Sequence, residues 1–124
     1  MIGGVLFTLQ CEGPPGGAHG ASIATVYDEI LAYPVWRCNY TAFTANLNIN
    51  YNKVIPLNTW VQFEARIDKI IKRKVYMVGK LYDGNNHSLI YSTGTGLWIE
   101  SNHLANINNQ HPDNQSINNK HSKL

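Results

Sequence analysis

The sequence predicts an α+β domain in which one long helix covers one face of an antiparallel sheet. Two observations carry this prediction. Apolar residues recur at helical spacing in a single segment, residues 21–33, and the later segments alternate apolar with polar residues between turn signals. The length of 124 residues suits one domain, and 44% hydrophobic against 15% charged residues is typical of a globular protein.

The first third of the chain predicts a strand, a loop and the helix. Residues 5–9 (VLFTL) favour a short strand, and residues 12–20 (EGPPGGAHG) form a loop because Pro and Gly at this density break regular structure. From Ala21 to Tyr33 the apolar stripe comprises Ile23, Val26, Tyr27, Ile30 and Leu31. Pro34 is expected to end the helix near Tyr33, because a residue before proline avoids helical backbone angles.

Four strands are expected after a loop at residues 34–41. Alternation with a period of two predicts the first of them at residues 43–51, with Thr44 on its polar face. The opposite, buried face is formed by Phe43, Ala45, Leu47, Ile49 and Tyr51. Residues 60–68, 74–82 and 88–99 are the other strands, the last two joined by the turn sequence DGNN. Short turns between successive strands predict an antiparallel meander.

The composition changes beyond Glu100, where Asn, His, Ser and Gln predominate. We therefore divide the chain into a folded domain at residues 1–100 and an Asn-rich tail at residues 101–124, which we expect to be mostly disordered. Three histidines of this tail, His103, His111 and His121, match no metal-ligand spacing, so no metal site is expected.

Charge and cysteine content exclude several classes of protein. The net charge of +2 is too small to indicate a nucleic-acid partner, although half of the ten basic residues lie between Lys69 and Lys80. No apolar run is long enough for a membrane span, and the N-terminal residues do not resemble a signal peptide. Cys11 and Cys38 form no disulfide framework. We expect a soluble intracellular protein.

The acid within the helix, Asp28, is a first candidate for chemistry. On a wheel of about 100° per residue, Asp28 lies about 140° from Ile23, outside the apolar stripe and beside three small residues. These are Ala21, Ala24 and Ala32. The small side chains permit a ligand to approach the carboxylate, but the helix geometry alone favours an ordinary solvated acid on a helix rich in alanine.

His19 and Gly20 precede the helix and form a second candidate. Backbone N–H groups at a helix start lack internal partners and can stabilise a carbonyl oxygen that becomes negative, provided that no side chain blocks them. Gly20 meets this condition. A tight turn at Gly20 and local packing of His19 would account for the same two residues, so the alternatives remain balanced.

Three segments, in this order and at fitting spacing, resemble one known family. EGPPGGAHGASIATVYDE, TANLNINYNKVIP and RKVYMVGKLYD are similar to segments of the hotdog-fold acyl-CoA thioesterases, above all the animal superfamily members of the mitochondrial type. The resemblance covers residues 3–99. It implies a long central helix wrapped by an antiparallel sheet of about five or six strands, and a homodimer, with a dimer of dimers as a further option.

The resemblance also implies roles for particular residues. The His-Gly-Gly motif falls on His19, Gly20 and Ala21, and the amide of Gly20 would polarise the thioester carbonyl. The family's acid falls on Asp28, as general base or nucleophile. Thr44 matches the hydroxyl residue that positions water and would come from the partner subunit. Ala21 stands where the motif has its second glycine, and narrows the site by one methyl group.

A substrate and a runner-up function follow from the resemblance. The resemblance implies that the basic run of this chain, Lys72, Arg73 and Lys74, contacts the phosphates of coenzyme A. Each of these residues, taken singly, is explained equally well as part of a solvated strand start. The implied reaction is hydrolysis of fatty acyl-CoA to fatty acid and coenzyme A, with no metal or other cofactor, in the mitochondrion or the cytoplasm. The alternative is a catalytically weak domain that binds acyl-CoA or fatty acid, or that binds another protein.

Overall fold

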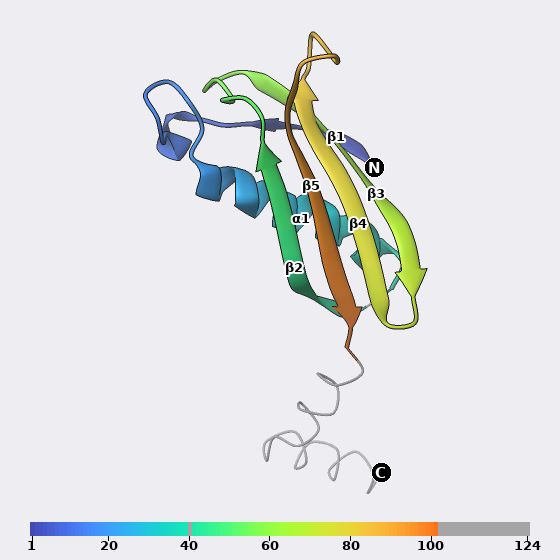
Figure 1. Cartoon of the computed structure of the whole chain (residues 1–124). Helices are drawn as coiled ribbons and strands as arrows, with labels where there is room; N and C mark the ends of the chain where they lie inside the picture. Colours follow the sequence, from blue (N-terminus) through green and yellow to red (C-terminus); the bar gives the residue numbers. More distant parts are fainter. Residues whose placement is uncertain (40, 102–124) are drawn as a thin grey trace, which may run out of the picture.

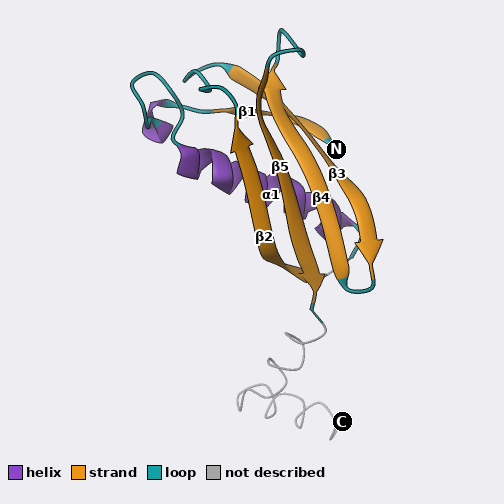
Figure 2. Ribbon diagram, viewed as in Figure 1, coloured by secondary structure: helices purple, strands orange, loops and turns teal. Residues whose placement is uncertain are grey.

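The structure is a computed structural model that describes residues 1–39 and 41–101. It contains one long helix, α1 (Gly20–Arg37), and a short 3-10 helix, η1 (Leu9–Cys11). The strands are β1 (Ile2–Leu6), β2 (Ala42–Tyr51), β3 (Trp60–Ile71), β4 (Lys74–Asp83) and β5 (Ile90–Glu100). Figure 1 shows α1 lying across one face of the sheet, and Figure 2 shows the same view with the strands in orange.

All strand pairs in the described part of the chain are antiparallel, and their order is β1-β3-β4-β5-β2. The predicted meander is confirmed for β3, β4 and β5. It is wrong for β2, which pairs with β5 at the far edge rather than with β3. The connection from β2 to β3 therefore crosses the sheet, and β2 is left with one unpaired edge.

The core lies between α1 and the sheet. The predicted helical stripe is confirmed, since Ile23, Tyr27, Ile30 and Leu31 are buried and Val26 is partly buried. Glycines make room for this face: a Cβ at Gly94 would lie 2.5 Å from the ring of Tyr27. Burying each large apolar side chain contributes about 1.5–3 kcal/mol, which fixes the helix against the sheet.

The predicted end of the helix at Tyr33 is wrong, because α1 continues through Pro34 to Arg37. Proline removes its own N–H from the helical ladder and its ring crowds the carbonyl four residues earlier, so the segment beyond it must be held by packing. Val35 is fully buried in the core cluster, so the extra turn is stabilised by tertiary contacts.

The first strand covers residues 2–6 rather than 5–9, and residues 9–11 form η1. Gly3 and Gly4 interrupt the alternation of apolar and polar side chains in β1, so the sequence pattern does not indicate a strand there. Gly3 serves packing, since a Cβ there would lie 2.5 Å from Phe63 Cζ of the neighbouring strand. In addition, β3 extends to Ile71, and β5 begins at Ile90 instead of residue 88.

The domain extends by one residue beyond the expected boundary. Ser101 is buried, and its N–H donates to the Thr41 carbonyl at 2.7 Å. The rest of the predicted tail, with its three histidines, lies outside the described residues.

Candidate active site

The acid Asp28 and the hydroxyl of Thr44 are in direct contact. Thr44 Oγ1 donates a hydrogen bond of 2.8 Å to Asp28 Oδ1, and both side chains are exposed on the single chain. No other described residue donates a hydrogen bond to Asp28. One carboxylate oxygen is thus held by β2, and the other remains accessible to water or a substrate.

A β-bulge explains how Thr44 reaches the helix. Thr44 pairs with Trp98 and Asn46 pairs with Leu97, so the register skips one residue, at Ala45. Directly opposed residues point to the same face of a sheet, and Trp98 is buried against the core. Thr44 therefore faces α1, and the extra residue changes the alternation.

The predicted face assignment of β2 is consequently wrong at the start of the strand. Phe43 is 45% exposed and lies opposite Ile99, on the face away from Leu47. The resemblance placed Thr44 in the partner's site, whereas the structure joins Thr44 to Asp28 of the same chain.

The helix start has a well-defined hydrogen-bond pattern. His19 is the N-cap residue, and its Nδ1 accepts from the Ala21 N–H at 2.9 Å. In a neutral imidazole the proton then resides on Nε2. The His19 carbonyl accepts from the Ile23 N–H at 3.1 Å, and the Gly20 carbonyl accepts from the Tyr51 hydroxyl at 3.0 Å.

These bonds engage the N–H groups of Ala21 and Ile23 and leave the Gly20 N–H, the first of the helix, available as a donor. Among the described residues, none accepts a hydrogen bond from it. The N-terminal end of a helix carries positive potential, which favours a negative oxygen at this donor. Gly20 therefore fits an oxyanion site, and a Cβ in place of its hydrogen would still leave 3.7 Å to Tyr51.

One chain does not bring Gly20 and Asp28 together. Asp28 comes eight residues after Gly20 in the same helix, which separates them by about 12 Å along the axis. A reacting carbonyl needs its oxygen about 3 Å from the donor and its carbon next to the attacking group. The two groups of a single chain are too far apart for direct attack on one carbonyl.

The basic run forms the turn between β3 and β4, at the end of the sheet where β2 begins (Figure 1). Trp98 of β5 pairs with Thr44 of β2 on one side and with Val75 of β4 on the other. Lys74, the residue before Val75, therefore lies at the same level of the sheet as Thr44, two strands away. Arg73 is engaged, since its Nε and Nη2 donate to the Glu100 carbonyl at 3.0 and 2.9 Å. Lys72 and Lys74 are exposed.

Two cavities on the single chain lie away from these groups. One of about 580 Å³ is lined by Met1 and Ile2 and by residues of β3, β4 and β5, including Glu64 and Lys80. The other, of about 470 Å³, lies between the last turns of α1 and β3. Neither includes Asp28, Gly20 or Thr44, of which Asp28 and Thr44 are exposed and Gly20 is half-buried on one chain.

Three further properties concern metal ligands, cysteines and helix length. Among the described residues, no cluster of three or more His, Cys, Asp or Glu side chains could hold a metal ion. Cys11 and Cys38 are free thiols. Within the same residues, no helix has both the length and the apolar character needed to cross a bilayer.

Sequence reasoning missed Tyr51 as a site residue. It was assigned to the buried face of a strand, whereas the residue is 53% exposed and its hydroxyl donates to the Gly20 carbonyl. The contact becomes visible only when the structure places the end of β2 beside the start of α1. The residue does lie within the segment TANLNINY, which carries the resemblance.

Comparison with known proteins decides the family. A sequence model described as thioesterase superfamily matches residues 15–90, which include Gly20, Asp28 and Thr44. The chain belongs to the thioesterase superfamily. The resemblance stated from the sequence is thereby confirmed.

Two relatives illustrate the match. Acyl-coenzyme A thioesterase THEM5 from Homo sapiens is 32% identical over 89 residues, which are 72% of this chain and 36% of that protein. Acyl-coenzyme A thioesterase THEM4 from Xenopus laevis is 36% identical over 90 residues, or 72% of this chain and 40% of that protein. The chain thus spans well under half the length of these curated relatives.

Solved structures of the superfamily share the fold. A hypothetical thioesterase from Streptococcus pneumoniae, crystallised with coenzyme A, has a TM-score of 0.75 at 16% identity, covering 81% of this chain and 77% of that one. Zebra fish thioesterase superfamily member 2 has a TM-score of 0.74 at 16% identity, covering 81% and 73%. The hotdog fold, with one helix and five antiparallel strands, is therefore confirmed.

Proposed function

We propose that this protein hydrolyses fatty acyl-CoA to free fatty acid and coenzyme A. The observation that carries the proposal is the Asp28–Thr44 pair, an accessible carboxylate held by a hydroxyl, in a member of the thioesterase superfamily. The relatives named acyl-coenzyme A thioesterases support the substrate class. The free N–H of Gly20 supplies the donor that the reaction requires.

The proposed chemistry needs three groups. Asp28 removes a proton from water, whose oxygen attacks the thioester carbon, or the carboxylate attacks directly and water then hydrolyses the anhydride. The Gly20 N–H stabilises the oxygen that becomes negative. The carbon–sulfur bond breaks, and the thiolate of coenzyme A leaves without strong acid assistance. Thr44 orients the carboxylate, and the reaction needs no metal or other cofactor.

A solved structure with the same fold has an aspartate and a threonine at the same spacing. Variants of the Streptococcus pneumoniae protein replace one aspartate and one threonine with alanine. Those two positions are as far apart in sequence as Asp28 and Thr44, which are separated by 16 residues. The proposal assigns the corresponding roles to the two residues of this chain.

The basic turn is proposed to bind the phosphates of coenzyme A. It lies at the end of the sheet where Thr44 holds Asp28, and Lys72 and Lys74 are exposed. The Arg73 guanidinium donates to the Glu100 carbonyl, so we propose that it holds the shape of the turn. Its positive charge is proposed to contact a phosphate at the same time. An intracellular location accords with free thiols at Cys11 and Cys38 and with acyl-CoA as substrate.

A homodimer is part of the proposal because one chain separates Gly20 from Asp28 by about 12 Å. A second copy that pairs its β2 with this β2 would complete the sheet and lay the two helices side by side. The unpaired edge of β2 is ten residues long and carries no charged residue or proline, which is the kind of edge that pairs with another chain. Asp28 of one subunit would then meet Gly20 of the other.

The test of the reaction is release of free thiol from a panel of acyl-CoA substrates of different chain lengths by the purified wild-type chain. Turnover of at least one substrate is the expected result. Tight binding of coenzyme A or acyl-CoA without turnover at any chain length would instead support the alternative function, a catalytically weak binding domain.

The shared site has a separate test by complementation. Gly20→Pro deletes the N–H but suits the first helical position, and His19 already has the extended backbone that precedes proline (φ −70°, ψ 138°). Gly20→Pro and Asp28→Asn chains are each expected to be inactive. After unfolding and joint refolding, about a quarter of the wild-type activity should return, because each mixed dimer has one intact site.

If Gly20 and Asp28 act within one chain, the mixture will stay as inactive as its components. Size-exclusion chromatography of the mixture would show whether dimers form, and circular dichroism would show that the Gly20→Pro chain keeps its helix.

A further inference from the structure

Tyr51 contacts the oxyanion end of the helix from the last position of β2. Its hydroxyl donates to the Gly20 carbonyl at 3.0 Å. The hydrogen of Gly20 points at the ring, because a Cβ there would lie 3.7 Å from Tyr51 Cζ and the hydroxyl oxygen. The tyrosine is therefore placed against both the carbonyl and the Cα of this glycine.

The backbone that carries Tyr51 is fixed. The N–H groups of Asn52 and Lys53 both donate to the Tyr91 carbonyl, at 2.9 and 3.0 Å. Tyr51 itself lies opposite Ser92 in the pairing of β2 with β5. The hydroxyl thus acts from a rigid strand end rather than from a free loop.

Hydrogen bonds hold the two peptide groups that flank the Gly20 Cα. In the Gly20–Ala21 peptide, the carbonyl accepts from Tyr51 and the N–H donates to His19 Nδ1. In the peptide before it, the His19 carbonyl accepts from Ile23. Two successive peptide planes, which meet at the Gly20 Cα, are thereby held. The Gly20 N–H belongs to the first of them, and the hold of Tyr51 on the second prevents rotation about the Gly20 Cα, so this N–H keeps one direction.

We propose that Tyr51 is a positioning residue for the Gly20 amide. Its hydroxyl holds the Gly20–Ala21 peptide so that the Gly20 N–H points at the thioester oxygen as negative charge develops. Together with Thr44, this makes β2 the strand that holds both reacting parts of α1. The inference rests on the proposed thioesterase function.

The test uses Tyr51→Phe, which removes the hydroxyl and keeps the ring. We expect kcat to fall about tenfold with little change in KM, because misplacing an oxyanion donor raises the barrier without weakening substrate binding. The matched control is Tyr82→Phe, which loses a hydroxyl bonded to Glu64 at 3.1 Å on the other face of the sheet. Its kcat and KM should equal those of the wild type.

A second measurement is independent of activity. A hydrogen bond to a carbonyl polarises the N–H of the same peptide, so Tyr51→Phe should shift the amide resonance of Ala21 in an NMR spectrum, and Tyr82→Phe should not. An unchanged kcat in Tyr51→Phe, or a raised KM with unchanged kcat, would overturn the positioning role.

The two proposals can fail separately. A wild-type chain that hydrolyses no acyl-CoA refutes the thioesterase function, whereas an active wild type with a fully active Tyr51→Phe refutes only the role of Tyr51. If the wild type is inactive, an unmoved Ala21 resonance refutes the hold of Tyr51 on this peptide, and a shifted one supports it.

Discussion

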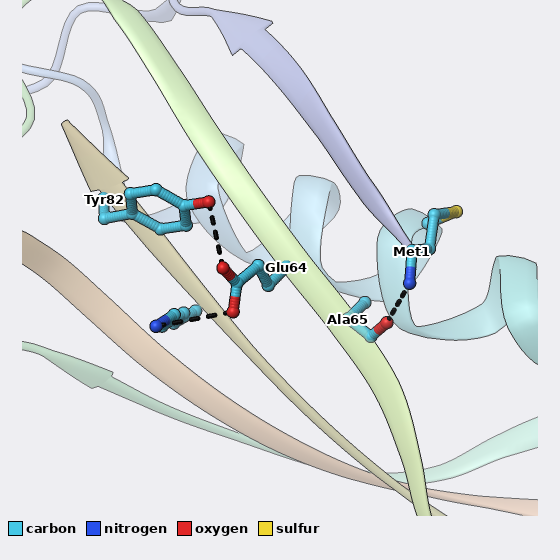
Figure 3. Close-up of polar contacts among 5 residues, drawn as sticks. Met1, Glu64, Ala65 and Tyr82 are labelled. Carbon is cyan, nitrogen blue, oxygen red and sulfur yellow. Dashed lines mark hydrogen bonds and ion pairs between the residues drawn. The ribbon is translucent and has the colours of Figure 1, made fainter. Parts of the chain in front are cut away.

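Two carboxylates on opposite sides of the sheet differ in how their oxygens are used. Glu64, on the outer face, accepts from the Tyr82 hydroxyl at 3.1 Å and pairs with Lys80 Nζ at 3.4 Å (Figure 3). Burial and the neighbouring Glu64 raise the pKa of Tyr82, so this hydroxyl stays protonated as a donor. Asp28, on the helix side, is bonded only to Thr44 among the described residues.

The difference separates a structural carboxylate from one that can react. Both oxygens of Glu64 are engaged by donors, one of them a cation, so the group is satisfied where it lies. Asp28 keeps one oxygen and its negative charge available to water. Asp28 is thus the carboxylate that can react, because one of its oxygens has no donor among the described residues, whereas both oxygens of Glu64 have one. Variants of each region test this difference.

The largest effect is expected for Asp28→Asn. This change keeps the shape of the side chain but removes the base, so kcat for acyl-CoA hydrolysis should fall by about 100- to 10,000-fold. Glu64→Gln should keep the wild-type kcat, because Glu64 touches no reacting group. Thiol release measures both. Comparable activity of Asp28→Asn and Glu64→Gln would remove the distinction between the two carboxylates.

A smaller loss is expected for Thr44→Ala, since the carboxylate remains but loses the hydroxyl that orients it. The expected fall in kcat is about tenfold, in line with a hydrogen bond to a charged group. Thr44→Ser retains the hydroxyl and should recover most of the activity. If the serine variant is as slow as the alanine variant, Thr44 contributes to kcat through packing of its methyl group and not through the hydrogen bond.

The basic turn should affect binding instead of rate. Replacing Lys72 and Lys74 together by Ala, with Arg73 left to hold the Glu100 carbonyl, should raise KM about three- to tenfold at low salt, and less at high salt. Lys80→Ala, which removes a cation of the outer-face cluster, is the matched control with unchanged KM. If the KM of the double variant does not depend on salt concentration, the turn does not bind phosphates and is ordinary solvated surface.

The smallest effect concerns stability at the hairpin after β4. Asp83 accepts from the N–H groups of Asn85 and Asn86 and from the Tyr91 hydroxyl, and these bonds lower the pKa of its carboxyl group. Because the folded pKa is depressed, the stabilisation is present above the unfolded pKa and is lost as the pH falls through the folded value.

Asp83→Asn should therefore lower the thermal midpoint at neutral pH, and the difference from wild type should shrink below about pH 4. Thermal unfolding followed by circular dichroism at several pH values measures this, with activity at neutral pH as the check that the site is intact. A difference that stays constant with pH would mean that the charge of Asp83 does not contribute.

The site residues differ in how well the sequence predicted them. The positions of Gly20 and Asp28 at the start and in the middle of one helix follow from the apolar periodicity, whereas their catalytic roles stay predictions of the resemblance. Thr44 was assigned to the right strand but to the wrong face, since a one-residue bulge at Ala45 leaves no sign in an alternating pattern. Tyr51 was missed because its partner, Gly20, lies 31 residues away.

The sequence by itself determined the α+β class, the core stripe of α1, the hairpin between β4 and β5, and the family. These depend on local periodicity, turn residues and short motifs. Only the tertiary structure decided that α1 passes through Pro34, that β2 pairs with β5, and that Thr44 turns toward Asp28. Each of these depends on packing between residues far apart in sequence, where burial of Val35 or Trp98 outweighs the local preference.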